Sequence, residues 1–554
     1  MIESSIVNDP NKRKQLELQV QREFLNAKND TRRDLALRLN GVAMRAGGTG
    51  YQFVGYAALE RFYRGDQWNH DEPAGASQRT DNYCAVIVDN LSSLPFDDTP
   101  EVNCPASDPT DDIETIKSEA KEKLIFRVWE DNDFAVEFDA WSKVTSLYGD
   151  GFLLGPFLEK DDRGKNIITF THAENPGSIR LIFADNTFKK LIGYIESSRM
   201  FVSMAEKIYG QAARDRGVKL EPSRQSQVET RIDPDTMIPM VNIDKYWTDE
   251  FNAIFINDKL MDFKVHNWGF VPIERVRNIY VPNWPYGKSD IEDVLDPQMM
   301  HNRTNNDLAN LLKWISTVNF WGKNLEGMQA LVAGLSRIYS VPDEGELHTF
   351  EKPGDPYITN TFVQQRRTAI VEISGVSEAM LSGSNNGMSG RALAMAFQGT
   401  IRKLSPRIKM FQSALQSLNR NILKLLEIAY PETKILIEGD YRNKVFMPAT
   451  LFRNVVDTIN KLQSGIISLD TAQREVGVAQ PKMEQKLMKK SLADPMLGPQ
   501  VARQPALLPR LNEGQNQPGQ SPMSPPGQQF ASQQGAVNAN AQQASGAAPV
   551  PTIQ

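Results

Sequence analysis

The stretch TFVQQRRTAIVEISGVSEAML (361–381), SGSNNGMSG (382–390) and the long segment 391–430 that follows organise the chain. The middle part combines three glycines with Asn385 and Asn386, residue types that tolerate a left-handed backbone and interrupt helices. In the last part, apolar residues recur at spacings of three and four, which predicts one long helix with a single buried stripe. The stripe comprises Leu393, Phe397, Ile401, Leu404, Ile408, Phe411, Leu415, Leu418, Ile422 and Leu425. Because Pro406 lies inside it, we expect a kinked helix.

Composition limits the classes of function. The chain has 554 residues, more than one ordinary domain, and its Lys and Arg (62) are outnumbered by Asp and Glu (68). This balance argues against a protein that grips duplex DNA, although it is compatible with a conduit through which DNA moves. With Cys84 and Cys104 as the only cysteines, we expect no disulfide framework and a reducing compartment. The N-terminus lacks an export signal and no apolar run is long enough to span a bilayer, so we expect a protein that is soluble and intracellular while it is made, with no membrane partner.

The first half of the chain predicts an α+β fold. Residues 1–50 form a charged, helix-prone arm with a partial apolar face (Leu16, Val20, Phe24). Within 51–286, helices are expected at 57–67, 85–94 and 113–148, the last broken near 131–133. The buried side of its second half is predicted from Val136, Ala140, Val144 and Leu147. Short strands then dominate 166–278, with a helical insertion at 203–216.

The segment 287–316 predicts a helix with an unusual polar face. Ser289 is expected to cap it, with Glu292 as its capping-box partner. Gly287-Lys288-Ser289 imitates a phosphate-binding loop, but Pro282 stands where the first glycine is needed, so nucleotide binding is rejected. The polar face carries uncharged amides that suit packing between identical neighbours, proximity to moving DNA, or an ordinary solvated surface. These amides belong to Asn302, Asn305, Asn306 and Asn310.

The remaining segments are a turn-rich region at 317–360, short strands at 434–438 and 444–447, and helix over 450–490. The turn-rich region is acidic, with Asp343, Glu344, Glu346 and Glu351. From about Leu492 the composition of Pro, Gln, Gly, Ala and Ser predicts a disordered tail.

No catalytic chemistry can be assigned. The five histidines are scattered without metal-ligand spacing, and neither a Gly-x-Ser-x-Gly elbow nor a Cys–His signature is present. His266 is expected to be a packed or hydrogen-bonded structural histidine. We therefore predict that the protein is not an enzyme and has no catalytic residue, metal or cofactor.

The order of these elements resembles the portal proteins of tailed bacteriophages. A Tyr63-Arg64-Gly65-Asp66-Gln67 turn followed by the apolar helix in NYCAVIVDNLSSLPF (82–96) is similar to a pair found early in that family. The resemblance implies a portal fold with an α+β wing (51–286), two stem helices (287–316 and 361–381), a clip (317–360), a tunnel loop (382–390), a long kinked wing helix (391–430) and a helical crown (431–491). The arm (1–50) and the tail (492–554) have no counterpart.

The resemblance also implies a function. Portal proteins form rings, commonly of twelve subunits, at one capsid vertex of the virion. The ring is the channel for genome packaging and ejection, and double-stranded DNA passes through it without sequence specificity. The implied partners are the large terminase of the packaging motor, tail adaptor proteins, and the major capsid and scaffolding proteins.

The implied sites fall on three segments. The tunnel loop would present Ser384, Asn385, Asn386, Gly387, Met388, Ser389 and Arg391 to the channel. The stem would present Asn302, Asn305, Asn306 and Asn310, and the clip would dock partners through Asp343, Glu344, Glu346 and Glu351. Two alternatives remain, another head–tail connector or minor capsid protein, and an ATPase or nuclease of the packaging apparatus.

Overall fold

The computed structural model describes residues 9–32, 38–39, 54–68, 79–93, 100–106, 111–161, 163–185, 187–220, 228–229, 237–282, 284–316, 320–323, 346–349, 356–382 and 390–447, and a few single positions from 462 to 485. Residues Met1–Lys482 form one unit and Met483–Gln554 a second, of which only Gln485 is described. The expected helix over 450–490 and the expected disordered tail therefore lie largely or wholly outside the described residues.

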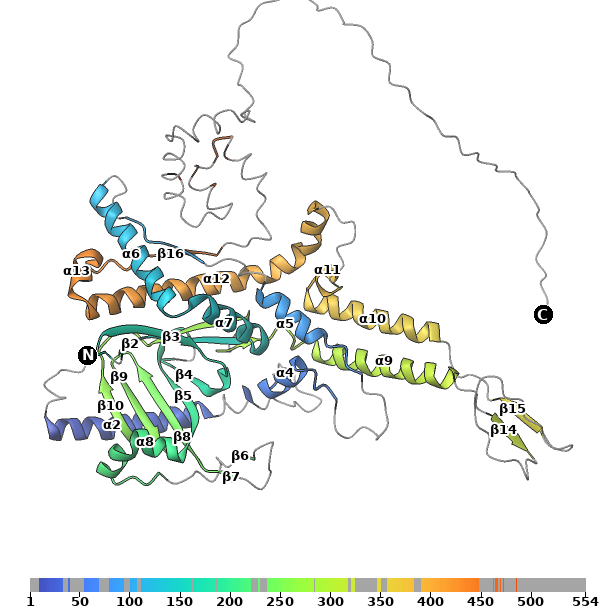
Figure 1. Ribbon diagram of the computed structural model, residues 1–554, viewed down its shortest axis with the longest axis horizontal. Coiled ribbons are helices and arrows are strands. Elements are labelled where there is room, and N and C mark those ends of the chain that lie inside the picture. The colour runs from blue at the N-terminus through green and yellow to red at the C-terminus, as the bar shows by residue number, and fades with distance from the viewer. Residues whose placement is uncertain are drawn as a thin grey trace, which may run out of the picture. The chain divides into compact units, whose positions relative to one another are not determined.

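Helices and strands are mixed along the chain, which confirms the α+β class (Figure 1). The helices are α2 (Pro10–Asp30), α4 (Tyr56–Tyr63), α5 (Tyr83–Ser93), α6 (Asp112–Asp131), α7 (Phe134–Tyr148), α8 (Val202–Asp215), α9 (Leu295–Ser316), α10 (Pro356–Ser374), α11 (Glu378–Ser382), α12 (Gly390–Ala429) and α13 (Pro431–Ile437). The longer strands are β2 (Asp150–Lys160), β3 (Asn166–His172), β4 (Ile179–Phe183), β5 (Leu191–Phe201), β8 (Met240–Thr248), β9 (Phe251–Ile256), β10 (Lys259–Val265) and β11 (Ile273–Arg277). Short pairs are β1 (Glu101–Asn103) with β16 (Lys444–Phe446), β6 (Val228–Glu229) with β7 (Met237–Ile238), β12 (Ile279–Tyr280) with β13 (Gly287–Lys288), and β14 (Phe320–Lys323) with β15 (Glu346–Thr349).

A five-stranded antiparallel sheet, in the order β10-β9-β8-β5-β4, is covered by a helix on each face. Successive side chains of a strand point to opposite faces. On one face, Val20 and Phe24 of α2 pack in a cluster with Tyr246 and Phe255, and the Phe24 and Phe255 rings stack at 3.7 Å. On the other, Ala205 and Ala213 of α8 pack against the sheet in a separate cluster. The partial apolar face of the N-terminal arm thus completes the hydrophobic core of this sheet.

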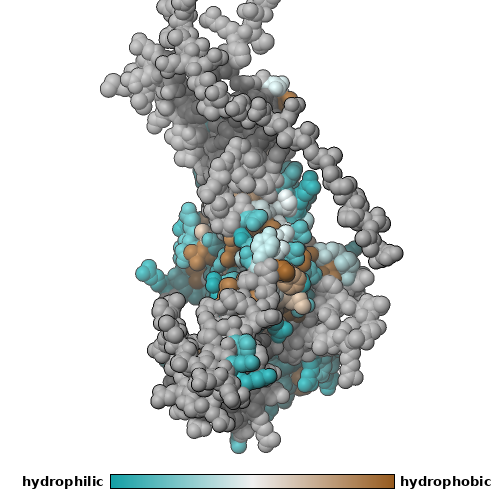
Figure 2. Space-filling model, turned by 90° about the vertical axis from the view of Figure 1, so that its right-hand side faces the viewer, coloured by the Kyte–Doolittle hydropathy of each residue, from teal (hydrophilic) through white to brown (hydrophobic). Residues whose placement is uncertain are grey.

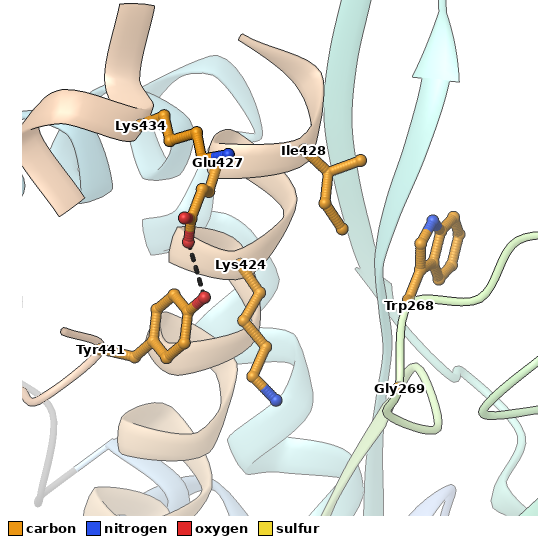
Figure 3. A pocket seen from close by; sticks show the side chains of 7 residues that line it. All are labelled: Trp268, Gly269, Lys424, Glu427, Ile428, Lys434 and Tyr441. Carbon is orange, nitrogen blue, oxygen red and sulfur yellow. Dashed lines mark hydrogen bonds between the residues drawn. The ribbon is translucent and has the colours of Figure 1, made fainter. Parts of the chain in front are cut away.

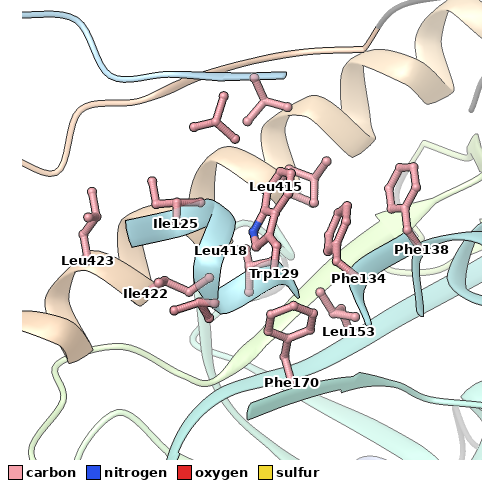
Figure 4. Close-up of a cluster of buried hydrophobic side chains, with 14 of the residues drawn as sticks. Ile125, Trp129, Phe134, Phe138, Leu153, Phe170, Leu415, Leu418, Ile422 and Leu423 are labelled. Atoms are coloured by element: carbon pink, nitrogen blue, oxygen red, sulfur yellow. The ribbon is translucent and has the colours of Figure 1, made fainter. Parts of the chain in front are cut away.

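The largest hydrophobic cluster lies between α6 and α7, the three-stranded sheet β11-β2-β3, and α12 (Figure 4). Trp129 and Phe134 stack at 4.0 Å, and the Trp129 indole N–H donates to Asn419 Oδ1 on α12 (3.1 Å). Trp141 of α7 meets Phe411 edge to face at 4.9 Å. Burying one such large side chain stabilises the fold by roughly 1.5–3 kcal/mol. These contacts fix α12 across the sheet.

Pro406 lies inside α12, as expected. Ile401 and Ile408 of the predicted stripe are half-buried, and the side chain of Leu393 lies outside the described residues. The other members of the stripe are buried: Phe397, Leu404, Phe411, Leu415, Leu418, Ile422 and Leu425. Figure 1 shows the helix bending toward its N-terminal end. Leu404 belongs to a second cluster, formed with α4, α5 and the start of α9, whereas Phe411 and the residues after it belong to the largest cluster. The proline therefore lies where α12 passes from one cluster to the other.

The break between α6 and α7 occurs at the predicted place. Asp111 caps α6 by accepting a hydrogen bond from the Ile113 N–H (2.9 Å), and Asp133 takes a left-handed conformation (φ 47°) at the break. Gly149 (φ 85°) ends α7, where any Cβ would lie 2.6 Å from the Lys288 carbonyl carbon. The chain can then turn directly into β2, because glycine tolerates both constraints.

Three local predictions are wrong. The buried side of α7 is formed by Phe134, Phe138, Trp141 and Thr145, while Val136 is 69% exposed and only Leu147 of the predicted set is buried. Residues 434–438 belong to helix α13 and its left-handed C-terminal residue, not to a strand, whereas the strand expected at 444–447 is confirmed as β16.

Ser289 is the third wrong prediction, since α9 begins six residues later, at Leu295. The Ser289 hydroxyl accepts from the Ile291 N–H (3.3 Å) and donates to the Leu147 carbonyl (2.6 Å). It therefore joins the turn before α9 to the end of α7.

The close approach at Gly151 gives a testable prediction. A Cβ at this position would lie 1.9 Å from Thr145 Oγ1 and 2.8 Å from the Trp141 indole nitrogen. We expect Gly151→Ala to lower the free energy of unfolding by about 1–3 kcal/mol, measured as a lower thermal unfolding midpoint. Gly399→Ala is the control, since a Cβ on this α12 glycine meets nothing within 4 Å and should stabilise by roughly 0.5–1 kcal/mol. Equal midpoints for the two variants would contradict the packing described.

The buried carboxyl of Glu274 predicts a pH dependence. Burial, the largest effect, raises its pKa from 4.5 to about 8, although hydrogen bonds from Ser417 and Asn421 act in the opposite direction. The stability contributed by the neutral carboxyl is fully present below the unfolded pKa and is lost as pH rises through about 8. From pH about 6 to about 9, the unfolding midpoint should fall more in the wild type than in Glu274→Gln. Glu432→Gln, at an exposed position, should behave as the wild type; parallel curves for all three would refute the prediction.

Candidate functional site

Three of the four asparagines predicted to line a channel make hydrogen bonds inside the chain. Asn302 and Asn306 are 1% and 5% exposed, and their side-chain oxygens accept from the backbone N–H groups of Asp81 and Arg79, both at 3.1 Å. Asn305 donates to the Asp81 carboxylate (2.8 Å). Helix α9 is thus fastened along one face to the segment before α5.

The Tyr63–Gln67 turn takes part in the same network. The Asn302 amide donates to Gln67 Oε1 (2.6 Å), and the Gln67 amide donates to Asn82 Oδ1 (3.0 Å). Asn82 in turn donates to the Tyr63 carbonyl (2.8 Å), across a turn made by Gly65 at φ 83°. Gln67 thus packs against the turn, which gives the motif a structural role.

Gln298 and His301 complete what we name the amide seam, defined as Gln67, Arg79, Asp81, Asn82, Gln298, His301, Asn302, Asn305 and Asn306. Gln298 donates to the Asp81 carbonyl, and His301 Nε2 lies 3.5 Å from the Asp81 carboxylate. Burial, the largest effect, lowers the pKa of His301, although the Asp81 carboxylate acts in the opposite direction. The seam is a polar contact within one subunit.

The environments expected for these amides therefore need correction. Asn302 and Asn306 do not form a solvated surface, because residues of the same chain bury them and bond their side-chain oxygens. Asn310 is exposed on α9. The channel role of the four amides stays a prediction, and Asn310 has the accessibility that this role requires.

A buried charge cluster lies directly before α9. The Asp290 side chain is fully buried, and its carboxylate accepts from the Ser146 hydroxyl (2.6 Å) and pairs with Arg407. Lys403 lies 3.2 Å from its second oxygen. Burial alone would raise the pKa of Asp290, but Arg407 and Lys403 outweigh it and lower the pKa to about 2. Asp290 is therefore ionised, and it holds α7, α9 and α12 together.

The two cations also bond the ends of other helices. Arg407 donates to the Leu91 carbonyl in α5 (3.0 Å), and Lys403 to the Ser374 carbonyl at the end of α10 (2.6 Å). The Thr400 hydroxyl donates to the carbonyl of Gly375, which has φ 66° (3.0 Å). Because helix ends leave carbonyl groups unpaired, these side chains stabilise the break between α10 and α11.

Most other predicted site residues lie outside the described part of the chain. This holds for Ser384, Asn385, Asn386, Gly387, Met388 and Ser389 in the loop, and for Asp343, Glu344 and Glu351. Arg391 lies in the first turn of α12, and the exposed Glu346 begins β15, which pairs with β14 in a hairpin. The roles predicted for these residues remain untested.

The histidines that the structure describes have structural partners. His266 stacks on Trp268 at 4.1 Å and accepts from its backbone N–H (3.3 Å), and burial lowers the pKa of His266 to about 4. This confirms that it is packed and hydrogen-bonded. His172 lies 2.7 Å from the Glu137 carboxylate, and His348 is exposed. Within the described ranges, no three His, Cys, Asp or Glu side chains are grouped so as to hold a metal ion.

Cys84 and Cys104 are free, buried thiols. Burial raises the pKa of each to about 12. None of the described helices is long and apolar enough to cross a membrane.

Sequence reasoning missed the charge cluster and the break at Gly375. The sequence patterns did not pair Asp290 with Lys403 or Arg407. One signal was present: two cations four residues apart, on either side of Pro406, lie on one face of a helix otherwise apolar there.

Asn302 gives a test of the amide seam. We expect Asn302→Ala to lower the free energy of unfolding by about 1–3 kcal/mol, because the Asp81 N–H and the Gln67 oxygen lose their partner. Asn310→Ala, at an exposed position of the same helix, should change it by less than about 0.5 kcal/mol. Thermal unfolding of the purified chain measures both, and an unchanged midpoint for Asn302→Ala would contradict a structural role.

A comparison with protein families matches residues 56–494 to the phage portal proteins described as SPP1 Gp6-like. The match begins at α4 and includes the amide seam, the charge cluster and α12. No curated protein matches the sequence. Because the family match covers well over half of the chain, the chain belongs to the SPP1 Gp6-like family of phage portal proteins, the head–tail connectors that act in DNA packaging.

Proposed function

We propose that the chain assembles as a closed ring, commonly of twelve subunits in this family, at one capsid vertex of the virion. The ring is the channel for packaging and ejecting double-stranded DNA, and the docking platform for the packaging motor and then the tail. Family membership is the observation that carries this proposal. The protein acts as a structural conduit rather than an enzyme.

Exposed apolar side chains on the two long helices beside each other, α9 and α10, support assembly. On α10, Tyr357 is 75% and Ile358 67% exposed, and Phe362 and Ile373 are also exposed. Met300 and Leu312 are exposed on α9. Figure 2 shows brown side chains beside teal ones on one face of the molecule. A neighbouring subunit in a ring would cover these apolar side chains.

The charge balance supports a channel that does not grip DNA. The chain has a net charge of −6, and the exposed side of α9 carries Asp307 as well as Arg303 and Lys313. A protein that binds duplex tightly needs a surplus of cations along its contact surface. In the assembled ring, Asn310 of α9 and the loop 382–390 face the channel, and Glu346 with the other acidic clip residues binds basic partners.

Native mass spectrometry and negative-stain images of the purified chain test the proposal. We expect a ring of about a dozen copies with a central hole. Ile358→Asp should shift the mass toward the monomer, because a buried unpaired charge would oppose the subunit contact. A chain that is monomeric, even with scaffolding protein added, would contradict the ring.

Asn360→Asp is the matched control. Asn360 is exposed on the same helix and is two positions from both Ile358 and Phe362, so it points away from them. It should assemble as the wild type. Equal loss of rings in both variants would show that charge on α10, not this apolar contact, controls assembly.

A further inference from the structure

An open hollow of about 470 Å³ lies at the C-terminal end of α12 (Figure 3). Lys424, Glu427 and Ile428 of α12 and Lys434 of α13 form one side, with Tyr441 below them. Trp268 and Gly269, in the loop between β10 and β11, face them. At 1.5 Å per residue, roughly 50–57 Å of α12 separates its lining residues from the start of the helix at Gly390. The hollow is therefore a surface distinct from the loop 382–390 and from α9.

One wall of the hollow is aromatic and apolar. Trp268 stacks on His266 at 4.1 Å and lies 6.0 Å from the Phe270 ring, with the planes nearly parallel. These contacts hold the half-buried indole in place. On the opposite side, Ile428 is 56% exposed. A rigid aromatic ring facing an exposed aliphatic side chain can bury an apolar group of a partner at little cost in side-chain entropy.

The hollow is also electropositive. The Lys424 ammonium lies 5.6 Å from the Phe270 ring centre and 5.9 Å from that of Tyr441, and Lys434 is exposed. Neither lysine forms an ion pair with any carboxylate in the part of the chain that the structure describes.

The one carboxylate in the lining, Glu427, accepts a hydrogen bond from the Tyr441 hydroxyl (2.6 Å). Burial, followed by this carboxylate, raises the pKa of Tyr441 to about 12, so the hydroxyl keeps its proton. The two cations are thus left for an external anion.

We propose that this hollow docks an acidic peptide segment of a partner protein, with an apolar side chain between Trp268 and Ile428 and carboxylates reaching Lys424 and Lys434. Charge complementarity selects the acidic partner. Nucleic acid fits less well, because a phosphate backbone needs a longer row of cations and would meet Glu427. The inference does not depend on ring formation, since every residue named belongs to one subunit.

A peptide-binding measurement tests the proposal. The probe is a fluorescein-labelled hexapeptide of alternating Glu and Leu, followed by anisotropy against the full-length chain at several salt concentrations. We expect saturable binding that weakens with salt, and no binding of the matching peptide of alternating Lys and Leu. Equal binding of the two peptides, or no binding of the acidic one, overturns the proposal.

Variants locate the binding. The double variant Lys424→Glu and Lys434→Glu should bind the acidic peptide roughly tenfold more weakly or worse. Lys409→Glu makes the same type of charge change at an exposed position of α12 outside the hollow, and should bind as the wild type. Undiminished binding by the double variant, or equal weakening in all variants, overturns the proposal.

Two further arms identify the ligand chemistry. Tyr441→Phe should weaken binding, since Glu427 loses its hydrogen bond and then competes for the lysines. An unlabelled peptide of alternating Glu and Ser should compete poorly, because it lacks the apolar side chain. If a short duplex DNA displaces the probe as well as the acidic peptide does, the hollow binds polyanions and the peptide proposal fails.

Discussion

The ionised, fully buried carboxylate of Asp290 is the interaction on which the described structure most depends. A buried charge is costly unless its partners are close, and here two cations and a hydroxyl surround it. Lys403 and Arg407 stand on either side of Pro406, which deprives α12 of one backbone hydrogen bond. The same carboxylate therefore binds the helix before and after its weakest turn. The buried charge cluster therefore stabilises both the bend at Pro406 and the start of α9.

The buried charge cluster also explains how α12 can contribute to two hydrophobic clusters. Leu404 packs with α4, α5 and the beginning of α9, while Phe411 packs with α6, α7 and the three-stranded sheet. A straight helix has one buried stripe, but the two clusters lie on different parts of the fold. The bend at Pro406, fixed by Asp290, lets one helix contribute to both.

Sequence patterns predicted the fold where the cause is local. The three–four spacing along α12 and the helix break near 131–133 depend on neighbouring residues, and both predictions were correct. The run at 434–438 failed because a short apolar run fits helix and strand equally, and Pro431 at the first turn of α13 decided for helix.

The amide seam could not be predicted, since it pairs residues more than 200 positions apart. An asparagine-rich helix face has the same sequence whether it meets solvent, DNA or another part of its own chain. The charge cluster could not be predicted for the same reason, because Asp290 and Arg407 are 117 positions apart in the sequence. The functional prediction came from the order of the elements, which resembles that of portal proteins, and not from contacts between distant residues.

The two buried thiols have a practical consequence for chemistry on this protein. Thiolate is the nucleophile in alkylation and disulfide exchange, and burial keeps Cys84 and Cys104 protonated at neutral pH. The folded chain therefore has no reactive thiol of its own, since these are its only cysteines. A single cysteine placed on an exposed helix position would be the one site that alkylates or cross-links. Because the native thiols do not react, cross-links formed by single introduced cysteines can locate contacts between copies of the chain one residue at a time.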